Sequence, residues 1–277
     1  MEELILTTLG TVSPYSKGNK NCPGYLVEYK NKKILLDCGN GITSRMKFPE
    51  DLKNLHVIIS HFHPDHFGDI TSIAQAALVY KRFGYIKNNI TVHVPKVAKI
   101  SEEYIFGGDD RDDWGHSEYI KRDIAELEYL KLLASTTPIE IEQYNGYGSI
   151  DVKSSDITIK TYQTQHDIDA YAFKLVTDIG TICYSGDTGY DTGLIDFIKD
   201  ADLFICESTF LIGQARINNN HLYAHEAGEI AKLANVKQLL LTHFWPEIDK
   251  EKYVEEAKEV FENTEALEEG KQLVLRR

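Results

Sequence analysis

One short segment of the chain, ISHFHPDHFGD at residues 59–69, is unusually rich in side chains that bind metal ions. Within six positions it holds His61, His63, Asp65 and His66. The preceding residues HVIIS predict a strand, which puts the first two histidines on one side. Pro64 then begins a turn that brings the aspartate and the third histidine to the start of a helix. A catalytic ion takes about four ligands and keeps one position open, so the segment predicts a centre of two metal ions completed by residues from elsewhere.

Three later residues are suited to complete such a centre, because each lies at the end of a strand-like run. They are His166 in TYQTQHDID, Asp187 in CYSGDTGY and His243 in LLLTHFWP. Taken singly, a histidine or aspartate at a strand end is usually a solvated residue or a turn former. Together with the histidine-rich segment, the three residues predict a set of seven metal ligands.

Short runs rich in Ile, Val, Leu and Tyr recur along the chain and predict strands. Apolar spacing predicts helices over residues 70–84, 117–130 and 224–234. Because strands come first in groups and then alternate with helices, the pattern favours two facing sheets with helices outside them. Residues 1–277 contain no low-complexity linker and are expected to form a single domain. Within it, residues 96–137 are either an insertion or cap, or a surface helical connection.

The composition argues against several classes of protein. The 277 residues carry 43 acidic and 30 basic side chains, a net charge of −13, which is unsuited to a protein that mainly grips a polyanion. The start of the chain lacks a basic and apolar leader, and no apolar run reaches membrane-spanning length, so we expect a cytoplasmic protein without a membrane partner. Four cysteines without CxxC spacing are expected to be free thiols, at Cys22, Cys38, Cys183 and Cys206.

In their order along the chain, the candidate ligands resemble the five motifs of the metallo-β-lactamase fold superfamily. The first motif matches Asp37 in LLDCGNG, the second is the histidine-rich segment, and His166, Asp187 and His243 match the other three. The resemblance implies an α/β fold, a four-layer αββα sandwich with the site at one edge between the sheets. It also implies that Asp37 is structural and orients the metal-binding loop. An aspartate rather than a cysteine at position 187 is similar to the phosphodiesterase and glyoxalase branches, not to the true β-lactamases.

The same resemblance implies how the ligands divide between two divalent ions. One ion is expected at His61, His63 and His166, the other at Asp65, His66 and His243, with Asp187 bridging them. Zinc is the expected ion because the ligands are mostly histidines, and manganese and iron are the alternatives. Asp65 is also expected to steer the attacking water.

A finer resemblance links the segments ADLFICESTF and NNNHLYAHEAGEIAKLANVKQLLLTHF to the ribonuclease Z-like branch. It implies that Glu207 orients and charges His221, which then protonates the leaving oxygen of a phosphodiester. Alternatively, the glutamate merely caps a strand and the histidine lies on a loop. His225 is a rival for the same role, although its place in a helical run favours a surface residue.

The chain also departs from ribonuclease Z. Those proteins carry a long basic arm for transfer RNA, commonly between the third and fourth motifs, but here only residues 167–186 separate them, enough for a hairpin. Cys206 replaces a motif histidine, and Leu222 and Tyr223 replace the usual Ser-Thr. Together with the net negative charge of the chain, these differences argue against a tRNA partner.

We therefore predict a binuclear metal-dependent hydrolase, a phosphodiesterase acting on a small or nucleotide-type phosphodiester. A tRNA 3′-processing endonuclease and a thioester or lactone hydrolase are the alternatives. The Gly-rich loop after the first strand offers Ser13, Asn21 and Tyr25 to line the substrate cleft. Because relatives by resemblance often dimerise through apolar helices near the site, residues 70–85 are a candidate surface for a homodimer.

Overall fold

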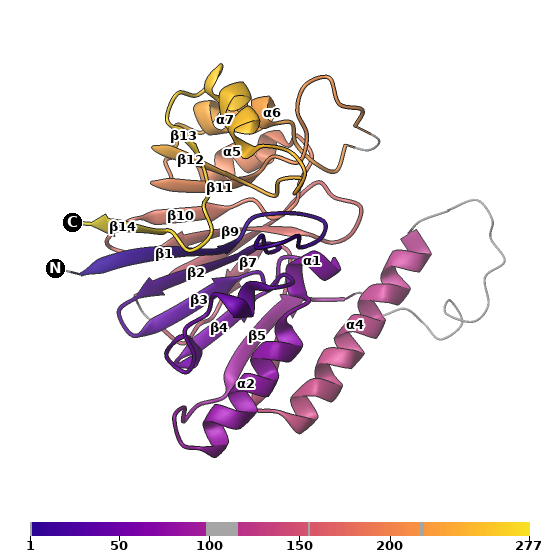
Figure 1. Cartoon of the computed structure of the whole chain (residues 1–277), viewed down its shortest axis with the longest axis vertical. Coiled ribbons are helices and arrows are strands. Elements are labelled where there is room, and N and C mark those ends of the chain that lie inside the picture. Colours follow the sequence, from indigo (N-terminus) through magenta and orange to yellow (C-terminus); the bar gives the residue numbers. More distant parts are fainter. Residues whose placement is uncertain (1, 98–115, 155, 217–218) are drawn as a thin grey trace.

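The chain folds into two facing β-sheets with helices on the outer side of each. A computed structural model describes residues 2–97, 116–154, 156–216 and 219–277, with residues 116–120 described by their backbone. Figure 1 shows the helices at the two ends of the molecule and the strands stacked between them. The predicted four-layer αββα sandwich is confirmed.

The first sheet contains, within the described residues, seven strands in the order β14-β1-β2-β3-β4-β5-β6. Their bounds are β1 Glu3–Gly10, β2 Gly24–Tyr29, β3 Lys32–Leu36, β4 Leu55–Ile58, β5 Ile90–Pro95, β6 Ile139–Tyr144 and β14 Gln272–Arg276. Strands β1 to β3 form an antiparallel meander, whereas β3 to β6 pair in parallel. Parallel neighbours need crossover connections, which include the helices α2 (Ile70–Arg82) and α4 (His116–Thr136). The predicted change from grouped strands to alternating strands and helices is confirmed.

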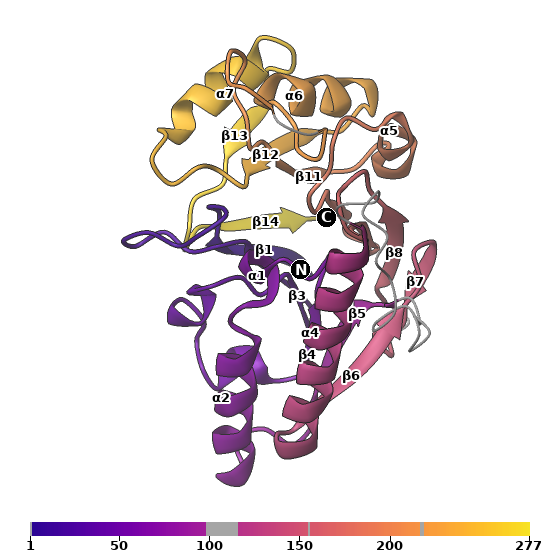
Figure 2. The same cartoon turned by 90° about the vertical axis from the view of Figure 1, so that its right-hand side faces the viewer.

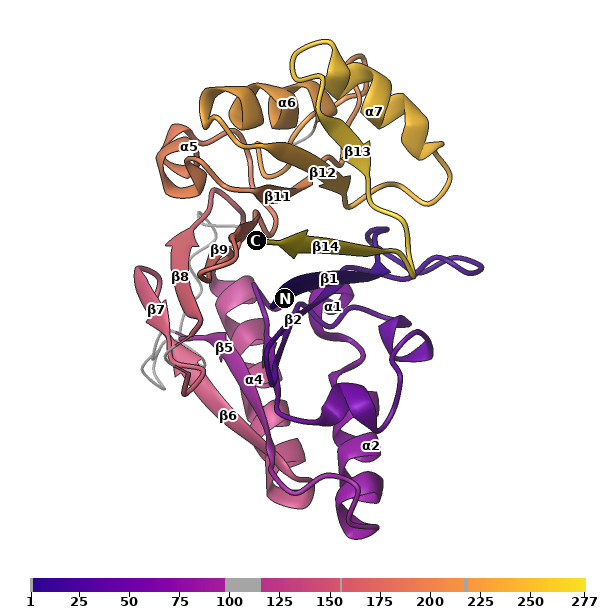
Figure 3. The ribbon, with the colours of Figure 1, turned by 90° about the vertical axis from the view of Figure 1, so that its left-hand side faces the viewer.

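The second sheet has the order β13-β12-β11-β10-β9-β8-β7. Its strands are β7 Gly148–Ile150, β8 Thr158–Gln163, β9 Tyr171–Val176, β10 Thr181–Tyr184, β11 Leu203–Glu207, β12 Gln238–Thr242 and β13 Thr264–Ala266. Strands β10 to β13 are parallel, and their crossovers carry the helices α5 (Thr192–Ile198), α6 (Ala224–Leu233) and α7 (Lys250–Lys258). The last strand, β14, pairs with β1, so both ends of the chain lie together in Figure 3.

Alternation along the strands divides the apolar side chains between separate core layers. Leu36 and Ile58 point into the layer between the sheets, where they pack in the same cluster as Phe173 of β9. Their neighbours Leu35 and Val57 point the other way and pack in the cluster that α2 and α4 cover. Strands buried on both faces read as nearly continuous apolar runs, which is why the strands are recognisable in the sequence.

The helix predicted over residues 70–84 is α2, which ends at Arg82, two residues before the left-handed Gly84 (φ 77°). Ile73 and Ala77 are fully buried on its packing face. Leu78 belongs to the apolar pattern but is 40% exposed, because it lies beyond the face that meets the sheet.

The second predicted helix is α4, which begins at His116, one residue before the expected Ser117 cap. Its residues Leu127, Leu130 and Leu133 are buried in the same core cluster as α2, and Figures 1 and 2 show the two helices side by side. The described part of the predicted insertion or cap is therefore packed on the outer face of the first sheet. Residues 98–115 of that segment lie outside the described part of the chain.

The third predicted helix is α6, which spans Ala224–Leu233. All four cysteines are buried free thiols, as predicted. No helix among the described residues combines the length and the apolar character needed to cross a bilayer.

Candidate metal centre

The candidate ligands meet at one edge of the molecule, where strands of both sheets end. The histidine-rich segment follows β4, and Asp37 follows the neighbouring strand β3. From the second sheet, His166 follows β8, Asp187 follows β10 and His243 follows β12. Parallel strands have their carboxyl ends at the same edge of a sheet, so residues far apart in sequence converge here.

The local conformation of the histidine-rich segment agrees with the sequence prediction. His63 is extended (φ −72°, ψ 137°) and precedes the short helix α1, Pro64–Phe67, in which proline occupies the first turn. Asp65 and His66 therefore project from a helical turn, whereas His61 and His63 project from extended chain. This bend is what allows one segment to contribute to two ligand groups.

The first group consists of His61, His63, His166 and Asp187. His63 Nδ1 lies 3.0 Å from His61 Nε2 and 3.2 Å from His166 Nε2, and His61 Nε2 lies 3.6 Å from Asp187 Oδ2. Ligands bound tetrahedrally at zinc–nitrogen distances are about 3.3 Å apart. The spacing therefore suits a single ion.

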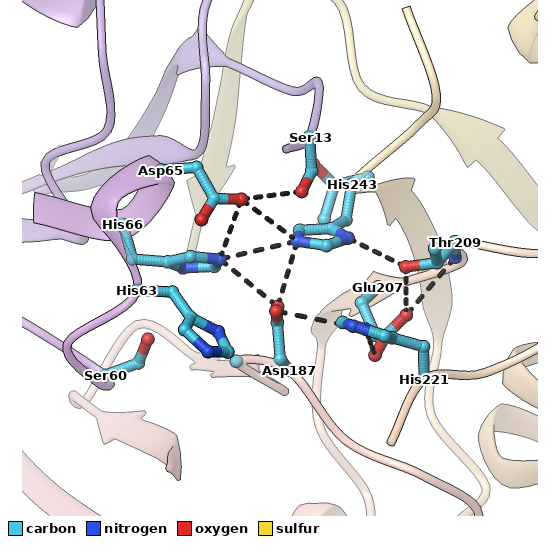
Figure 4. A network of polar contacts seen from close by, with 12 residues as sticks. Ser13, Ser60, His63, Asp65, His66, Asp187, Glu207, Thr209, His221 and His243 are labelled. Carbon is cyan, nitrogen blue, oxygen red and sulfur yellow. Dashed lines mark hydrogen bonds and ion pairs between the residues drawn. The ribbon is translucent and has the colours of Figure 1, made fainter. Parts of the chain in front are cut away.

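The second group consists of Asp65, His66 and His243, joined by the other oxygen of Asp187 (Figure 4). Asp65 Oδ2 lies 3.7 Å from the Nε2 atoms of both histidines, which are themselves 3.4 Å apart. Asp187 Oδ1 lies 3.4 Å from His66 Nε2 and 3.2 Å from His243 Nε2. These separations again match the ligands of one ion, and Asp187 is the residue shared by both groups.

A buried oxygen in this cluster is consistent with a cation. Asp187 is 2% exposed, and its Oδ1 makes no hydrogen bond to any described residue. A buried carboxylate oxygen without a hydrogen bond is costly unless a positive charge compensates it. Together with the donor set, this atom fits a divalent metal site.

Asp37 orients two of the histidines. Its Oδ2 accepts a hydrogen bond from His66 Nδ1 at 2.7 Å and from Ser60 Oγ at 2.8 Å, and Ser60 Oγ in turn accepts one from His61 Nδ1 at 2.9 Å. Tyr184 donates to the same oxygen at 2.6 Å. With Nδ1 protonated, each histidine presents its unprotonated Nε2 to the cluster. The structural role implied for Asp37 agrees with these contacts.

Two further histidines are oriented by groups that the sequence analysis missed. His166 Nδ1 donates to the backbone oxygen of Asn220 at 3.0 Å. His243 Nδ1 donates to Thr209 Oγ1 at 2.8 Å, and Thr209 donates to Glu207 Oε2 at 2.8 Å. Thr209 lies in the segment ADLFICESTF, which resembles the ribonuclease Z-like branch, but the sequence analysis gave it no role, and a backbone oxygen carries no sequence signal at all.

Glu207 and His221 form the predicted pair. Glu207 is fully buried, and its Oε1 accepts hydrogen bonds from His221 Nδ1 and from the Thr188 backbone N–H, both at 2.9 Å. Burial by itself would lower the pKa of His221, but the charge and hydrogen bond of Glu207 outweigh it and raise the pKa to about 9. His221 also stacks on His243, with ring centroids 5.3 Å apart. The rival His225 lies on α6, with Nε2 3.6 Å from Glu229 Oε1.

The three residues proposed to line the substrate cleft have different positions. Ser13 lies beside the candidate metal ligands, where its hydroxyl donates a hydrogen bond to Asp65 Oδ2 at 2.6 Å. The prediction is wrong for Tyr25, which is fully buried between the sheets because it lies on the inner face of β2. It is also wrong for Asn21, which is buried and donates through Nδ2 to the Leu9 backbone oxygen. Glycine-rich composition identifies a turn but does not tell which side chains face outward.

Comparison with known families agrees with this geometry. A model of the Beta-lactamase superfamily domain matches residues 32–244, a span that includes Asp37 and all seven candidate ligands. The chain belongs to the metallo-β-lactamase fold superfamily. The family and the two ligand groups together support a metal-dependent hydrolase.

The chain is similar to three proteins in particular. The probable metallo-hydrolase YhfI of Bacillus subtilis is 27% identical over 86% of this chain and 86% of its own length, and its crystal structure aligns with a TM-score of 0.81 over 98% and 99% of the two chains at 24% identity. The ribonuclease Z of Clostridioides difficile is 30% identical over 94% of each chain. A diphosphatase from the PhnP family is 12% identical and aligns with a TM-score of 0.66 over 99% of this chain and 97% of that one.

Proposed function

We propose that the protein is a binuclear metal-dependent phosphodiesterase that hydrolyses a small or nucleotide-type phosphodiester. The observation that carries this proposal is the Glu207–His221 pair beside the two ligand groups, with His221 Nδ1 only 3.9 Å from Asp187 Oδ2. An alkoxide is a poor leaving group, so cleavage of a phosphodiester benefits from a positioned acid. A thioester or lactone hydrolase has less need of such a group.

The chain's own residues would hold two ions. His61, His63 and His166 are proposed to bind one, and Asp65, His66 and His243 the other, with Asp187 bridging them. When bound, the ions supply Lewis acidity toward the phosphoryl oxygens and an activated water nucleophile. The mixture of histidine and carboxylate ligands favours zinc, with manganese or iron as alternatives.

Asp65 is proposed to orient the attacking water. Its hydrogen bond from Ser13 and its contacts with His66 and His243 all use Oδ2. Because one oxygen carries these contacts, Oδ1 is the atom proposed to accept a hydrogen bond from the nucleophile. Ser13 fixes the carboxylate in this orientation.

His221 is proposed to donate the proton to the leaving oxygen. Its Nδ1 donates to Glu207, so the transferred proton leaves from Nε2. The side chain is 24% exposed, which leaves it accessible to a substrate, whereas Glu207 is enclosed. Glu207 keeps the imidazole positively charged at neutral pH and holds its orientation, and such positioned acids contribute about 10²–10⁴-fold to the rate.

A small substrate is proposed in preference to tRNA. The relatives named ribonuclease Z and diphosphatase support a phosphorus ester or anhydride as the reacting group. Against a large polyanion stand the net charge of −13 and the segment between His166 and Asp187, in which β9 and β10 pair as an antiparallel hairpin. A submicromolar affinity for a tRNA precursor at physiological salt would contradict this preference.

The test compares two diesters on metal-reconstituted protein. One substrate is bis(p-nitrophenyl) phosphate, which has a good leaving group, and the other is a dinucleotide with an alkoxide leaving group. We expect Asp187→Ala to abolish the hydrolysis of both. We expect His221→Ala to slow the hydrolysis of the dinucleotide by about 10²–10⁴-fold and to slow that of the nitrophenyl ester much less. No turnover of either diester by protein that holds both ions, together with hydrolysis of a thioester or lactone, would refute the proposal.

A further inference from the structure

One histidine of the two ligand groups differs from the others. For His61, His66, His166 and His243, the nitrogen that faces away from the group is hydrogen-bonded to a protein oxygen at 2.7–3.0 Å. His63 directs Nδ1 at His61 and His166, so its outward nitrogen is Nε2. Ligand histidines almost always donate from their outward nitrogen, which sets the tautomer and the ring orientation. We therefore expect His63 Nε2–H to donate a hydrogen bond to an acceptor on the protein.

Asp167 is the residue placed to be that partner. It follows His166 in the loop between β8 and β9, and its Oδ1 lies 3.8 Å from His63 Nε2. The same oxygen lies 3.0 Å from His166 Nε2. Neither sequence motif nor resemblance points to this aspartate, because its role depends on the fold of the loop.

The oxygen of Asp167 that faces the histidines is itself incompletely satisfied. The side chain as a whole is 25% exposed, but Oδ1 is buried and makes no hydrogen bond to any described residue. Burying a charged oxygen without a hydrogen bond is costly, so a stabilising partner is needed. His63 Nε2–H would supply it after a movement of about 1 Å, the difference between the present separation and a normal hydrogen bond.

We propose that Asp167 is a positioning residue of the metal centre. Its carboxylate accepts a hydrogen bond from His63 Nε2–H, which keeps Nδ1 unprotonated and directed at the ion of the first group. This inference rests on the proposed two-ion centre. It extends the set of orienting groups to every histidine ligand, and it assigns the orientation of His63 to the loop that also carries His166.

The experiment measures metal affinity and not activity. Zinc binding to Asp167→Ala, Asp167→Asn and the wild type is titrated against a chromophoric chelator, and bound metal is counted by elemental analysis. The matched control is Asp169→Asn, two positions later, because Asp169 is exposed and accepts a hydrogen bond from Gln163 Nε2 at 2.9 Å. We expect Asp167→Ala to weaken one of the two sites by about 10–100-fold and the control to match the wild type.

Two further measurements separate positioning from a general structural role. Asp167→Asn keeps an acceptor oxygen, so it should recover part of the affinity lost in Asp167→Ala. The metal-free Asp167→Ala protein should unfold at the same or a higher denaturant concentration than the metal-free wild type, because it no longer buries an unsatisfied carboxylate oxygen.

The outcomes are distinguishable. If the wild type binds two ions and Asp167→Ala binds them equally well, the inference about Asp167 is wrong and the proposed function is unaffected. If the wild type binds no ions, the proposed function itself fails. If cobalt-substituted Asp167→Ala shows a visible spectrum of altered coordination number, Asp167 is a direct ligand and the positioning role is overturned.

Discussion

Asp37 orients residues of both ligand groups, so its replacement is an incisive test of the centre. The carboxylate accepts four hydrogen bonds of 2.6–2.8 Å, one at Oδ1 from the Ser60 N–H and three at Oδ2 from Ser60 Oγ, His66 Nδ1 and Tyr184 OH. In Asp37→Asn the amide oxygen replaces only one of these two oxygens. The least costly orientation keeps the amide oxygen at the position of Oδ2, where three donors converge. The amide NH2 then takes the position of Oδ1 and faces the Ser60 N–H.

The number of hydrogen bonds that Asp37→Asn loses sets the expected loss of stability and of metal affinity. One buried donor without an acceptor costs about 1–3 kcal/mol of stability. The loss of negative charge also weakens the hydrogen bond from His66, and changes in such orienting groups typically lower metal affinity by about 10–100-fold. That range corresponds to about 1.4–2.8 kcal/mol of binding free energy. Asp37→Ala, which removes all four acceptor contacts, should cost more in both measurements.

The assay combines urea unfolding of the metal-free protein with chelator competition for zinc. Asp69→Ala is the control, since it removes the one oxygen, Oδ2, that accepts hydrogen bonds from both the Thr43 N–H and the Thr43 hydroxyl, and Asp69 contacts none of the ligand nitrogens described above. This variant should lose stability and keep its metal affinity. If Asp37→Asn loses stability but binds zinc within about twofold of the wild type, Asp37 supports the loop without tuning the ligands, and the reasoning is refuted.

Three other predictions can be checked independently. Burial lowers the pKa of His56 to about 4 and of His93 to about 3, below the unfolded value of 6.5, so the unfolded chain binds more protons and stability falls as the pH drops below 6.5. At pH 5 each histidine lowers the free energy of unfolding by about 2 kcal/mol. Denaturant unfolding of His93→Gln should therefore show a smaller loss of stability between pH 7.5 and pH 5 than the wild type, and an equal loss would contradict this prediction. Thr209→Val removes the acceptor of His243 Nδ1 and should weaken zinc binding by about tenfold, whereas Thr209→Ser should not. If residues 70–85 form a homodimer, Phe83→Glu, at a position 71% exposed, should convert the dimer to a monomer in sedimentation velocity; a monomeric wild type would refute the predicted surface.

Much of the centre can be predicted from sequence because its main segment is local. The positions of His61, His63, Asp65 and His66 depend on one strand end and one helical turn, and the structure reproduces both. The strands are recognisable because both of their faces are buried. The hairpin between the third and fourth motifs also follows from length alone, since residues 167–186 leave room for little else.

The remaining contacts depend on how strands and sheets are arranged in space. Tyr184 of the second sheet reaches Asp37 of the first sheet from 147 positions away, and Thr209 meets His243 across 34 positions because β11 and β12 are neighbours in one sheet. Tyr25 shows the opposite case, because its loop-like sequence context suggested a cleft while its place on β2 buries it. Periodicity records which face of a strand is apolar, but not which side chain of the opposite sheet it meets.

By itself, the sequence determined which residues can bind ions, because ligand type and strand-end position are local properties. Only the tertiary structure decided which oxygen of Asp187 faces which ligand group, and which side-chain or backbone groups orient each histidine. It also placed Asp167 beside His63, although 104 positions separate them in the chain. The physical reason is that these contacts join residues from separate strand ends and loops, which only the packing of the strands and sheets brings together, and no local sequence pattern specifies that packing.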